Sequence, residues 1–350
     1  MMTHIRKVPD VAITLKHTLW HSGFELDVNV QIPATGITGL FGESGSGKTT
    51  LLRCVAGLET DMSRDPRPVH KRGIGYVFQE PRLFPHLDVR GNIEFGMRRS
   101  SAPKVDQDQV IEMLGLSDLL NRKPEGLSGG EAQRVAIAAV LLRSPQLVLM
   151  DEPLASLDQR RKDELLPYLD RLHDELSVPM IYVSHHIDEI SRLCDHLLLI
   201  EAGKIVGSGE LQEMLSRLDL PMLSGRNAGS VIVATPERYD SDYDLTQFRF
   251  SGGELHVPGY FDVNFPNLRL RIAASDVSIC LTRPQKTTIL NVLPATVDDI
   301  HRTGDSSDLV RLRLGADFLV AQVTRRSVVS LDLKKGDHVF AQVKSMTVRR

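Results

Sequence analysis

Hydrophobic and polar positions follow two rhythms in the first 220 residues of the chain. Short apolar runs rich in branched side chains are typical of buried strands, and they lie at residues 74–78, 147–150, 180–183 and 196–200. Longer stretches with helical periodicity lie at residues 107–121, 130–143, 159–176 and 186–194. Strands that alternate with helices predict an α/β fold around a largely parallel sheet. Residues 11–15 and 24–30 alternate apolar and polar side chains, which predicts an antiparallel pair added to that sheet.

The pattern changes after a helical stretch at residues 211–218. Residues 220–229 combine proline, serine, asparagine and glycine and are a candidate linker. Short alternating segments follow at residues 230–234, 268–272, 308–314, 318–323 and 338–343. A turn formed by Lys335, Gly336 and Asp337 precedes the last of them. This series predicts an all-β region built as small barrels.

Composition sets limits without indicating a function. Hydrophobic residues make up 41% of the chain and charged residues 25%, as in an ordinary globular protein, and the length of 350 residues suggests two domains. The net charge of −3 gives no electrostatic argument for binding nucleic acid, so we expect no such partner. Cys54, Cys194 and Cys280 show neither metal nor disulfide spacing, which favours a reducing compartment. Without an apolar signal core or a membrane-length apolar run, any membrane role must come through a partner.

A glycine-rich stretch carries the strongest chemical signal. Residues 42–49 read Gly-Glu-Ser-Gly-Ser-Gly-Lys-Thr between an apolar run and a helical run, the context of a phosphate-binding loop. The glycines let successive N–H groups point at phosphate oxygens, Lys48 adds a charge for the β- and γ-phosphates, and Thr49 offers a hydroxyl to Mg²⁺. The candidate nucleotide-binding residues are Gly42, Glu43, Ser44, Gly45, Ser46, Gly47, Lys48, Thr49 and Thr50. The alternative, an ordinary glycine-rich turn, is weakened by the flanking strand and helix.

Two further motifs bear on the same chemistry. Asp151 and Glu152 end an apolar strand, and beside a phosphate loop such an Asp holds Mg²⁺ while such a Glu accepts a proton from the attacking water. Ser128 is a good N-cap for the next helix, and Gly129 and Gly130 leave N–H groups at its positive end exposed, which predicts a second anion-binding terminus. Taken alone, the first motif is equally an acidic turn and the second equally an ordinary capped helix.

Together these motifs resemble the ATP-binding subunits of ABC transporters. Residues 127–131, Leu-Ser-Gly-Gly-Glu, resemble the signature motif of that family and stand between the phosphate loop and Asp151. By position, the resemblance implies Gln79 in the Q-loop, Asp158 in the D-loop and His185 as the switch histidine that contacts the γ-phosphate. It implies as catalytic residues Glu152, His185 and Gln79, and as Mg²⁺ ligands Thr49, Gln79 and Asp151. An ordinary loop role for Gln79 or His185 does not fit their order and spacing.

The resemblance also implies a stacking aromatic and a homodimer. Trp20 is the expected adenine-stacking residue from its distance before Lys48, with His21 and Phe24 as alternatives because the register of that hairpin is open. In the family, the signature motif of one subunit closes over the ATP held by the phosphate loop of another. The helix that begins at Ser128 is not needed by its own phosphate loop, which already has a helix, so a second subunit would give it a ligand.

The resemblance covers the whole chain and divides it into domains. Residues 1–222 correspond to an ABC ATPase domain with a mixed sheet core. Its helical subdomain, at about residues 86–145, is expected to dock the membrane subunits. Residues 223–285 are a linker and accessory β region, and residues 286–350 resemble a small molybdate-binding β-barrel.

Subgroup features favour molybdate as the transported ion. Glu131 stands where most of the family has glutamine, and residues 152–158, 164–169 and 179–185 look like the molybdate-import subgroup. Importers of sulfate or thiosulfate, tungstate, polyamines and ferric iron stay open as alternatives. The implied partners are a second ATPase subunit, two transmembrane permease subunits and, indirectly, a periplasmic oxyanion-binding protein. The implied location is the cytoplasmic face of the bacterial inner membrane.

Two other classes of function fit less well. A soluble ABC ATPase outside transport would need basic arms or inserted domains, and the sequence shows neither. A non-hydrolysing oxyanion sensor would not retain both Glu152 and His185.

The C-terminal region offers a candidate oxyanion site by resemblance. Residues 287–293 and 341–345 look like the start and end of the molybdate-binding barrel, which implies Thr288, Lys344 and Ser345 as oxyanion-binding residues. Leu290 departs from the pattern, because the family commonly has an arginine there, and its absence removes a bidentate donor. A purely structural or dimerising barrel is therefore the alternative.

Overall fold

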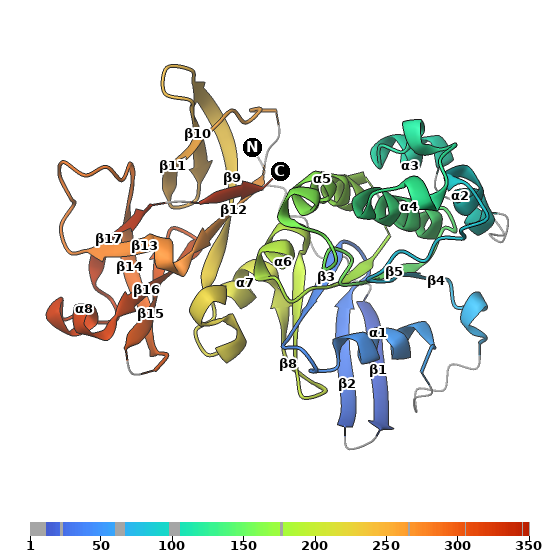
Figure 1. Ribbon diagram of the computed structural model, residues 1–350. Helices are drawn as coiled ribbons and strands as arrows, with labels where there is room; N and C mark the ends of the chain where they lie inside the picture. The colour runs from blue at the N-terminus through green and yellow to red at the C-terminus, as the bar shows by residue number, and fades with distance from the viewer. Residues whose placement is uncertain are drawn as a thin grey trace. The chain divides into compact units, whose positions relative to one another are not determined.

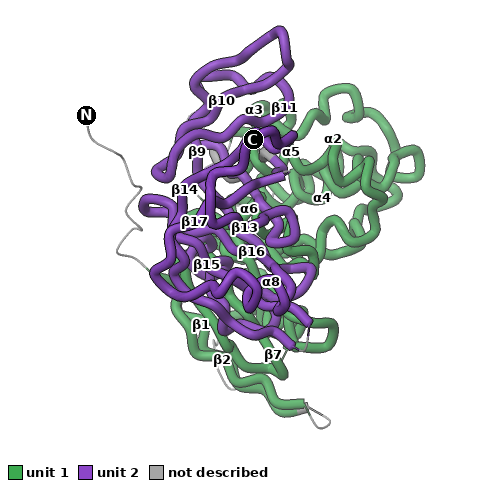
Figure 2. Tube along the Cα trace, turned by 90° about the vertical axis from the view of Figure 1, so that its left-hand side faces the viewer, with its two compact units in different colours: residues 1–209 green, residues 210–350 purple. Residues whose placement is uncertain are grey.

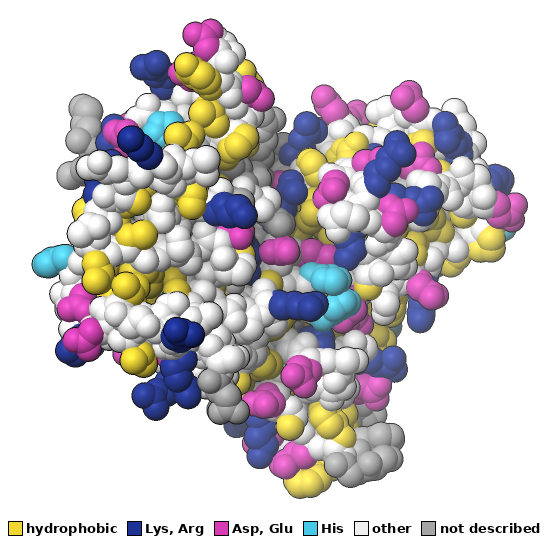
Figure 3. Space-filling view, turned by 60° about the vertical axis from the view of Figure 1, so that its left-hand side comes forward, with side chains coloured by type: hydrophobic (Ala, Val, Ile, Leu, Met, Phe, Trp, Pro, Cys, Tyr) yellow, Lys and Arg dark blue, Asp and Glu magenta, His cyan; other side chains and the backbone are white. Residues whose placement is uncertain are grey.

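The computed structural model describes residues 12–21, 24–59, 67–97, 106–175, 178–264, 267–304, 306–344 and 346–349. The chain divides into two compact units, Met1–Gly209 and Glu210–Arg350, coloured green and purple in Figure 2. No helix in the described part of the chain is long and apolar enough to cross a membrane. Charged side chains of both signs are interspersed over the face drawn in Figure 3, in keeping with the small net charge of −3.

Eight described strands form one mixed sheet in the first unit, in the order β1-β2-β8-β7-β3-β6-β5-β4 (Figure 1). Their bounds are β1 (Ala12–His21), β2 (Phe24–Pro33), β3 (Ile37–Phe41), β4 (Ile74–Val77), β5 (Leu147–Asp151), β6 (Met180–Val183), β7 (His196–Glu201) and β8 (Lys204–Glu210). Strand β3 pairs in parallel with β6 and β7, and β5 pairs in parallel with β4 and β6. The predicted strands are confirmed, as is the antiparallel β1–β2 pair.

Six described helices accompany this sheet. They are α1 (Lys48–Ala56), α2 (Val89–Met97), α3 (Gln107–Met113), α4 (Gly129–Leu141), α5 (Gln159–Glu175) and α6 (Ile187–Leu193). Helices α2, α3 and α5 pack against α4 (Figure 1). The predicted helix over residues 107–121 is too long, because Gly115 has a φ of 59°, a left-handed conformation that ends α3. Only a 3₁₀ turn, Ser117–Leu119, follows.

The second unit begins with α7 (Leu211–Ser216) and is otherwise mostly β-structure. The candidate linker at residues 220–229 forms two 3₁₀ turns, Pro221–Leu223 and Gly225–Asn227, and Leu220 and Leu223 are buried. The remaining elements are β9 (Gly229–Asp240), β10 (Leu245–Phe250), β11 (Gly253–Pro258), β12 (Leu268–Ala273), β13 (Val277–Cys280), β14 (Asn291–Arg302), β15 (Ser307–Leu314), β16 (Asp317–Thr324), α8 (Arg325–Ser330), β17 (His338–Val343) and β18 (Thr347–Arg349).

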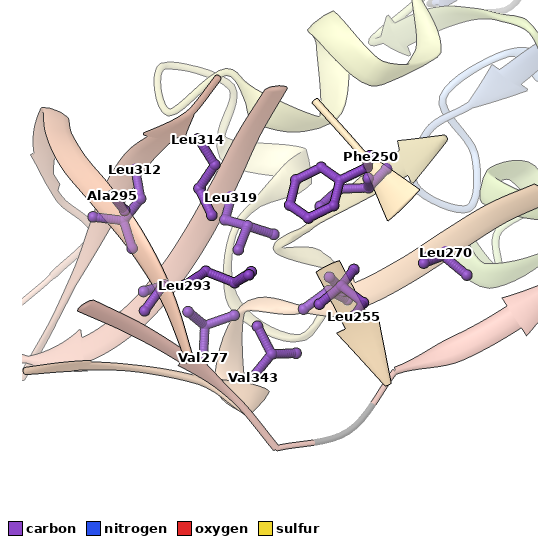
Figure 4. Packing of buried hydrophobic residues seen from close by; sticks show 14 of the residues in the cluster. Phe250, Leu255, Leu270, Val277, Leu293, Ala295, Leu312, Leu314, Leu319 and Val343 are labelled. Atoms are coloured by element: carbon purple, nitrogen blue, oxygen red, sulfur yellow. The ribbon is translucent and has the colours of Figure 1, made fainter. Parts of the chain in front are cut away.

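These strands make two five-stranded sheets, β11-β10-β9-β12-β18 and β13-β17-β14-β15-β16. The edge strands β13 and β16 of the second sheet approach each other, so this sheet curls toward a barrel. Strand β18, near the C-terminus, pairs with β12 of the first sheet. Strand β13, which lies before the predicted boundary at residue 285, pairs with β17 of the second sheet. Leu255 and Phe250 from the first sheet face Leu293 and Leu319 from the second in one apolar core (Figure 4). An all-β region is confirmed, and the domain boundaries at residues 222 and 285 stay predictions.

Candidate functional site

Four neighbouring strands deliver the predicted site residues to one edge of the first sheet. Because β3, β6, β5 and β4 are adjacent and parallel, their carboxyl ends lie side by side. The phosphate loop follows β3, Gln79 follows β4, Asp151 and Glu152 stand at the end of β5, and His185 follows β6. This edge is where ligands bind in open α/β sheets.

The phosphate loop has the backbone that its glycines predict. Gly45 and Gly47 have φ angles of 82° and 104°, which favour glycine, and a Cβ on Gly42 would clash with the carbonyl oxygen of Ile200. The loop runs directly into α1, where Leu51 N–H donates to the Gly47 carbonyl at 2.8 Å. The N-terminus of α1 therefore opens onto the loop, as a phosphate site requires.

Lys48 is a buried cation in this loop, with 6% of its surface exposed. Its Nζ donates to the carbonyl oxygens of Gly42 at 2.9 Å and Glu43 at 2.8 Å. Burial lowers the pKa of Lys48, while the nearby carboxylates of Glu152 and Asp151 act to raise it. Beside it, the buried Oγ of Ser46 has no hydrogen-bond partner in the described part of the chain. A buried cation and an unpartnered buried hydroxyl in a loop of this conformation fit the phosphates of ATP.

Asp151 forms the second part of the site. Thr49 Oγ1 donates to Asp151 Oδ1 at 3.0 Å, and the Tyr76 hydroxyl donates to Oδ2 at 2.8 Å. Burial, followed by the Asp151 charge, raises the pKa of Tyr76, so its phenol stays a donor. These three side chains and Gln79 line a cavity of about 470 Å³. A hydroxyl, a carboxylate and an amide are oxygen ligands of the kind Mg²⁺ takes beside a phosphate, so the residues fit that ion.

Glu152 and His185 are in direct contact. His185 Nδ1 lies 3.1 Å from Glu152 Oε2, although the two residues follow different strands. Glu152 has a φ of 46°, an uncommon backbone conformation for a residue that is not glycine, and its N–H donates to the Val183 carbonyl of β6 at 3.1 Å. Local strain of this type is common where a side chain must be aimed at a reaction centre.

The signature segment confirms Ser128 as the N-cap of α4 and adds a capping box with Glu131. Ser128 Oγ accepts a hydrogen bond from Glu131 N–H at 3.3 Å, and Glu131 Oε2 accepts one from Ser128 N–H at 2.7 Å. This backbone donor is the main reason why the pKa of Glu131 is lowered. A Cβ on Gly130 would meet open space, and one on Gly129 would lie 3.2 Å from Leu157 in the D-loop segment. Glu131 had entered the sequence argument only as a subgroup marker, and the structure gives it a role in capping α4.

Asp158 precedes α5 and accepts a hydrogen bond on Oδ1 from Arg161 N–H at 2.9 Å. It is therefore bound to the first turn of α5 and stays exposed.

The aromatic residues of the β1–β2 hairpin take different positions. Trp20 pairs with Glu25 across the hairpin and is 65% exposed. The Phe24 ring lies over the phosphate loop, where its Cζ would be 2.7 Å from a Cβ on Gly47. The side chain of His21 lies outside the described residues. Trp20 stays the predicted adenine contact, with Phe24 packed against the loop below.

Two of the three predicted oxyanion residues, Thr288 and Lys344, lie at one end of the second sheet of the second unit. Asn291 pairs with Val343, so Thr288, which shortly precedes Asn291, and Lys344, which follows Val343, belong to the same end of β14 and β17. Thr288 and Lys344 are exposed, as is Leu290 at 63%. Ser345 lies outside the described residues.

Sequence reasoning missed three residues that support the site. Tyr76 was assigned only to a buried strand, although a tyrosine in an apolar strand usually has a partner for its hydroxyl. Gln133 is 1% exposed and donates to the Phe78 carbonyl at 3.2 Å, next to Gln79. Glu189, in α6, is a buried carboxylate close to the His185 loop. Nothing in the sequence marks Glu189 as buried, because a charged residue within a short helical pattern is ordinarily expected on the exposed face of the helix.

Comparisons with known proteins agree with this geometry. Residues 26–155 match the family model described as ABC transporter, and residues 287–349 match the one described as TOBE domain. The molybdenum import ATP-binding protein ModC of Methylococcus capsulatus is 47% identical over 95% of this chain and 97% of its own length. ModC 1 of Azotobacter vinelandii is 45% identical over 97% of this chain and 99% of its own length.

A solved structure is similar in fold to part of this chain. It is cbiO1 from Clostridium perfringens, part of the ABC transporter complex cbiONQ, with a TM-score of 0.52 and 27% identity. The match covers 59% of this chain and 92% of that chain.

Proposed function

We propose that this chain, which belongs to the family of molybdenum import ATP-binding proteins of ABC transporters, hydrolyses ATP to drive molybdate into the cell. One observation carries the proposal. The carboxylate of Glu152 lies 3.1 Å from His185 at the sheet edge where the phosphate loop and Asp151 also stand. A base, its histidine partner and a phosphate-binding loop are the parts that ATP hydrolysis needs.

The phosphate loop and Lys48 are proposed to bind the phosphates of ATP. The ammonium group would exchange the carbonyls of Gly42 and Glu43 for β- and γ-phosphate oxygens, which stabilise a buried cation better because they carry charge. The other loop residues, from Glu43 to Thr50, contribute N–H groups and hydroxyls, and Trp20 stacks on the adenine.

Thr49, Asp151 and Gln79 are proposed to hold Mg²⁺. When bound beside ATP, Mg²⁺ neutralises charge on the phosphate oxygens. Thr49 and Asp151 are already joined at 3.0 Å, so their oxygens lie close enough to act on one ion. Gln79 lines the same cavity from the end of β4.

Glu152 is proposed as the general base and His185 as its partner. The carboxylate accepts a proton from the attacking water, while the imidazole fixes the carboxylate and faces the γ-phosphate. The backbone bond from Glu152 N–H to Val183 holds the base at the end of β5, against the neighbouring strand.

A homodimer is proposed to complete each site. Ser128, Gly129, Gly130 and Asp158 of one copy would contact the ATP held by the other copy. The open space beside Gly130 at the positive end of α4 supports this arrangement. The dimer would bind two transmembrane permease subunits at the cytoplasmic face of a bacterial inner membrane. A periplasmic oxyanion-binding protein would deliver molybdate to those subunits.

The second unit is proposed to sense oxyanions through Thr288, Lys344 and Ser345. Leu290 supplies no donor, so we expect weak binding. Equilibrium binding of molybdate to the intact protein and to Lys344→Ala distinguishes an oxyanion sensor from a purely structural unit. Binding that the substitution abolishes supports the sensor, and no binding up to millimolar concentrations leaves the unit structural.

Steady-state ATPase assays test the central proposal. Glu152→Gln keeps the shape of the side chain and removes the base, so turnover should fall by about 10²-fold or more. ATP affinity, measured by titration calorimetry, should persist because the phosphate loop is intact. A Glu152→Gln protein that hydrolyses ATP at the wild-type rate would overturn the assignment.

A further inference from the structure

A buried carboxylate lies behind the switch histidine, and the proposed reaction does not use it. Glu189, in α6, is 6% exposed and accepts three hydrogen bonds from side chains. Its Oε2 accepts from Ser184 Oγ at 2.7 Å and from the Tyr182 hydroxyl at 3.0 Å, while Oε1 accepts from Lys162 Nζ at 2.9 Å. A buried charge is costly unless it is paired and hydrogen-bonded, and here both conditions are met.

The bonds on Oε2 lead to the backbone of the switch loop. Ser184 Oγ donates to Glu189 and accepts a hydrogen bond from His186 N–H at 3.0 Å. His185 lies between these two bonded residues, and its ring contacts Glu152 at 3.1 Å. Glu189 therefore holds both neighbours of the switch histidine, one directly and one through a hydroxyl.

The bond on Oε1 leads to the D-loop. Lys162 is in the first turn of α5, and its backbone N–H donates to the Asp158 carbonyl at 3.0 Å. Its ammonium pairs with Glu189, and both side chains are largely buried, at 12% and 8% exposed. One carboxylate thus connects the helix turn that carries Asp158 with the loop that carries His185.

We infer that Glu189 is a positioning residue that couples the D-loop at Asp158 to the switch histidine. When Asp158 meets the second subunit, a shift of the first turn of α5 is transmitted through Lys162 and Glu189 to the His185 loop. His185, which already contacts Glu152 in the single chain, is thereby held in place toward the γ-phosphate when the dimer closes. This inference rests on the proposed ATPase function and adds the route by which dimer closure sets the catalytic geometry.

Substitutions along this route should slow turnover without weakening ATP binding. In Glu189→Gln the amide NH₂ must face either Lys162, which cannot accept a hydrogen bond, or the two hydroxyls, which must then turn and accept. In both cases the charge that pairs with Lys162 is lost and the bonds on Ser184 and Tyr182 are weakened or rearranged. Misplacement of His185 should lower kcat by about tenfold or more. The KM for ATP and the calorimetric affinity should stay within about twofold, because the phosphate loop is untouched.

Two further variants follow the same route. Ser184→Ala removes the link to His186 without leaving a new buried charge, and it keeps the test valid even where Glu189→Gln folds poorly. Its kcat should fall similarly, and the double variant should be no slower than the slower single one, because both changes break one chain of bonds. Lys162→Met should lower kcat as well, since it breaks the link to α5.

A second ion pair between the same helices provides the matched control. Arg192 Nε of α6 donates to Asp170 Oδ2 of α5 at 2.8 Å, in a partly buried pair away from the switch loop. Asp170→Asn should affect thermal stability as Glu189→Gln does while leaving kcat at the wild-type value. Wild-type kcat in Glu189→Gln and Ser184→Ala, or an equal loss of kcat in Asp170→Asn, would overturn the coupling. If the wild-type protein had no ATPase activity, that result would instead contradict the proposed function itself.

Discussion

At the scale of single residues, the carboxylate of Asp151 is held by hydrogen bonds to both of its oxygens. Thr49 and Tyr76 each donate to one of its oxygens. Motif spacing was sufficient to identify Thr49 and Asp151, because both follow from the phosphate loop and the strand that ends in acidic residues. The hydrogen bond from Tyr76 to Asp151 was not predicted, because a strand pattern indicates only which residues are buried. The partner of a buried hydroxyl depends on which strand is adjacent, and here that is β5.

Replacing Tyr76 by phenylalanine should weaken Mg²⁺ binding more than ATP binding. Without the phenol, Oδ2 of Asp151 loses its hydrogen-bond donor and the orientation of the carboxylate is less fixed. Loss of a partner that orients a metal ligand typically costs about 10- to 100-fold in metal affinity. The Mg²⁺ concentration for half-maximal ATPase activity should rise, and Mn²⁺ binding followed by electron paramagnetic resonance should weaken in parallel. Unchanged metal dependence in both assays would show that the phenol only fills space.

At the scale of elements, local sequence signals succeeded where a side chain acts within its own segment. Ser128 was predicted as an N-cap and caps α4 in the structure, while the reciprocal bond to Glu131 was not predicted, although its spacing is that of a capping box. The predicted extent of α3 was wrong. The helical pattern of apolar residues continues beyond Gly115, but the left-handed backbone of this glycine ends the helix. Packing of the following 3₁₀ turn buries Leu119 without continuing α3.

The charge of Glu131 should make the stability of the first unit sensitive to acid. Its pKa is lowered in the folded protein, so its contribution is complete above the pKa of the unfolded chain and is lost as pH falls through the folded value. Glu131→Gln keeps an acceptor for Ser128 N–H but lacks the charge. Wild type should therefore be the more stable protein at neutral pH, by about 0.5 to 1 kcal/mol. Chemical denaturation at pH 7 and pH 3 should show that difference shrinking; a constant difference would exclude the charge as its cause.

At the scale of the whole molecule, the two units differ in how far their folds could be predicted. The first has parallel strands joined by helices, and connection rules then place the phosphate loop, Asp151 and His185 at one edge. In the second unit, β18 pairs with β12 and β13 pairs with β17, and in both pairs several other strands lie between the partners along the chain. Antiparallel pairing between distant segments depends on the final packing, so alternation alone identified strands but not their partners.

Action between two copies is a property of the assembled molecule. Mixed Lys48→Ala and Ser128→Arg chains should form heterodimers in which one site has lost both elements and the other is intact. ATPase activity should then appear in the mixture at a level that neither homodimer reaches. Activity equal to the average of the two homodimers would mean that Ser128 serves the phosphate loop of its own chain.

Transport is the most direct test of the account. Proteoliposomes would contain this chain with its permease subunits, enclose Mg-ATP and face radiolabelled molybdate with its binding protein outside. We predict that molybdate accumulates with the wild-type chain and does not accumulate with Glu152→Gln. Equal accumulation in both preparations, or uptake of sulfate in place of molybdate, would contradict the account.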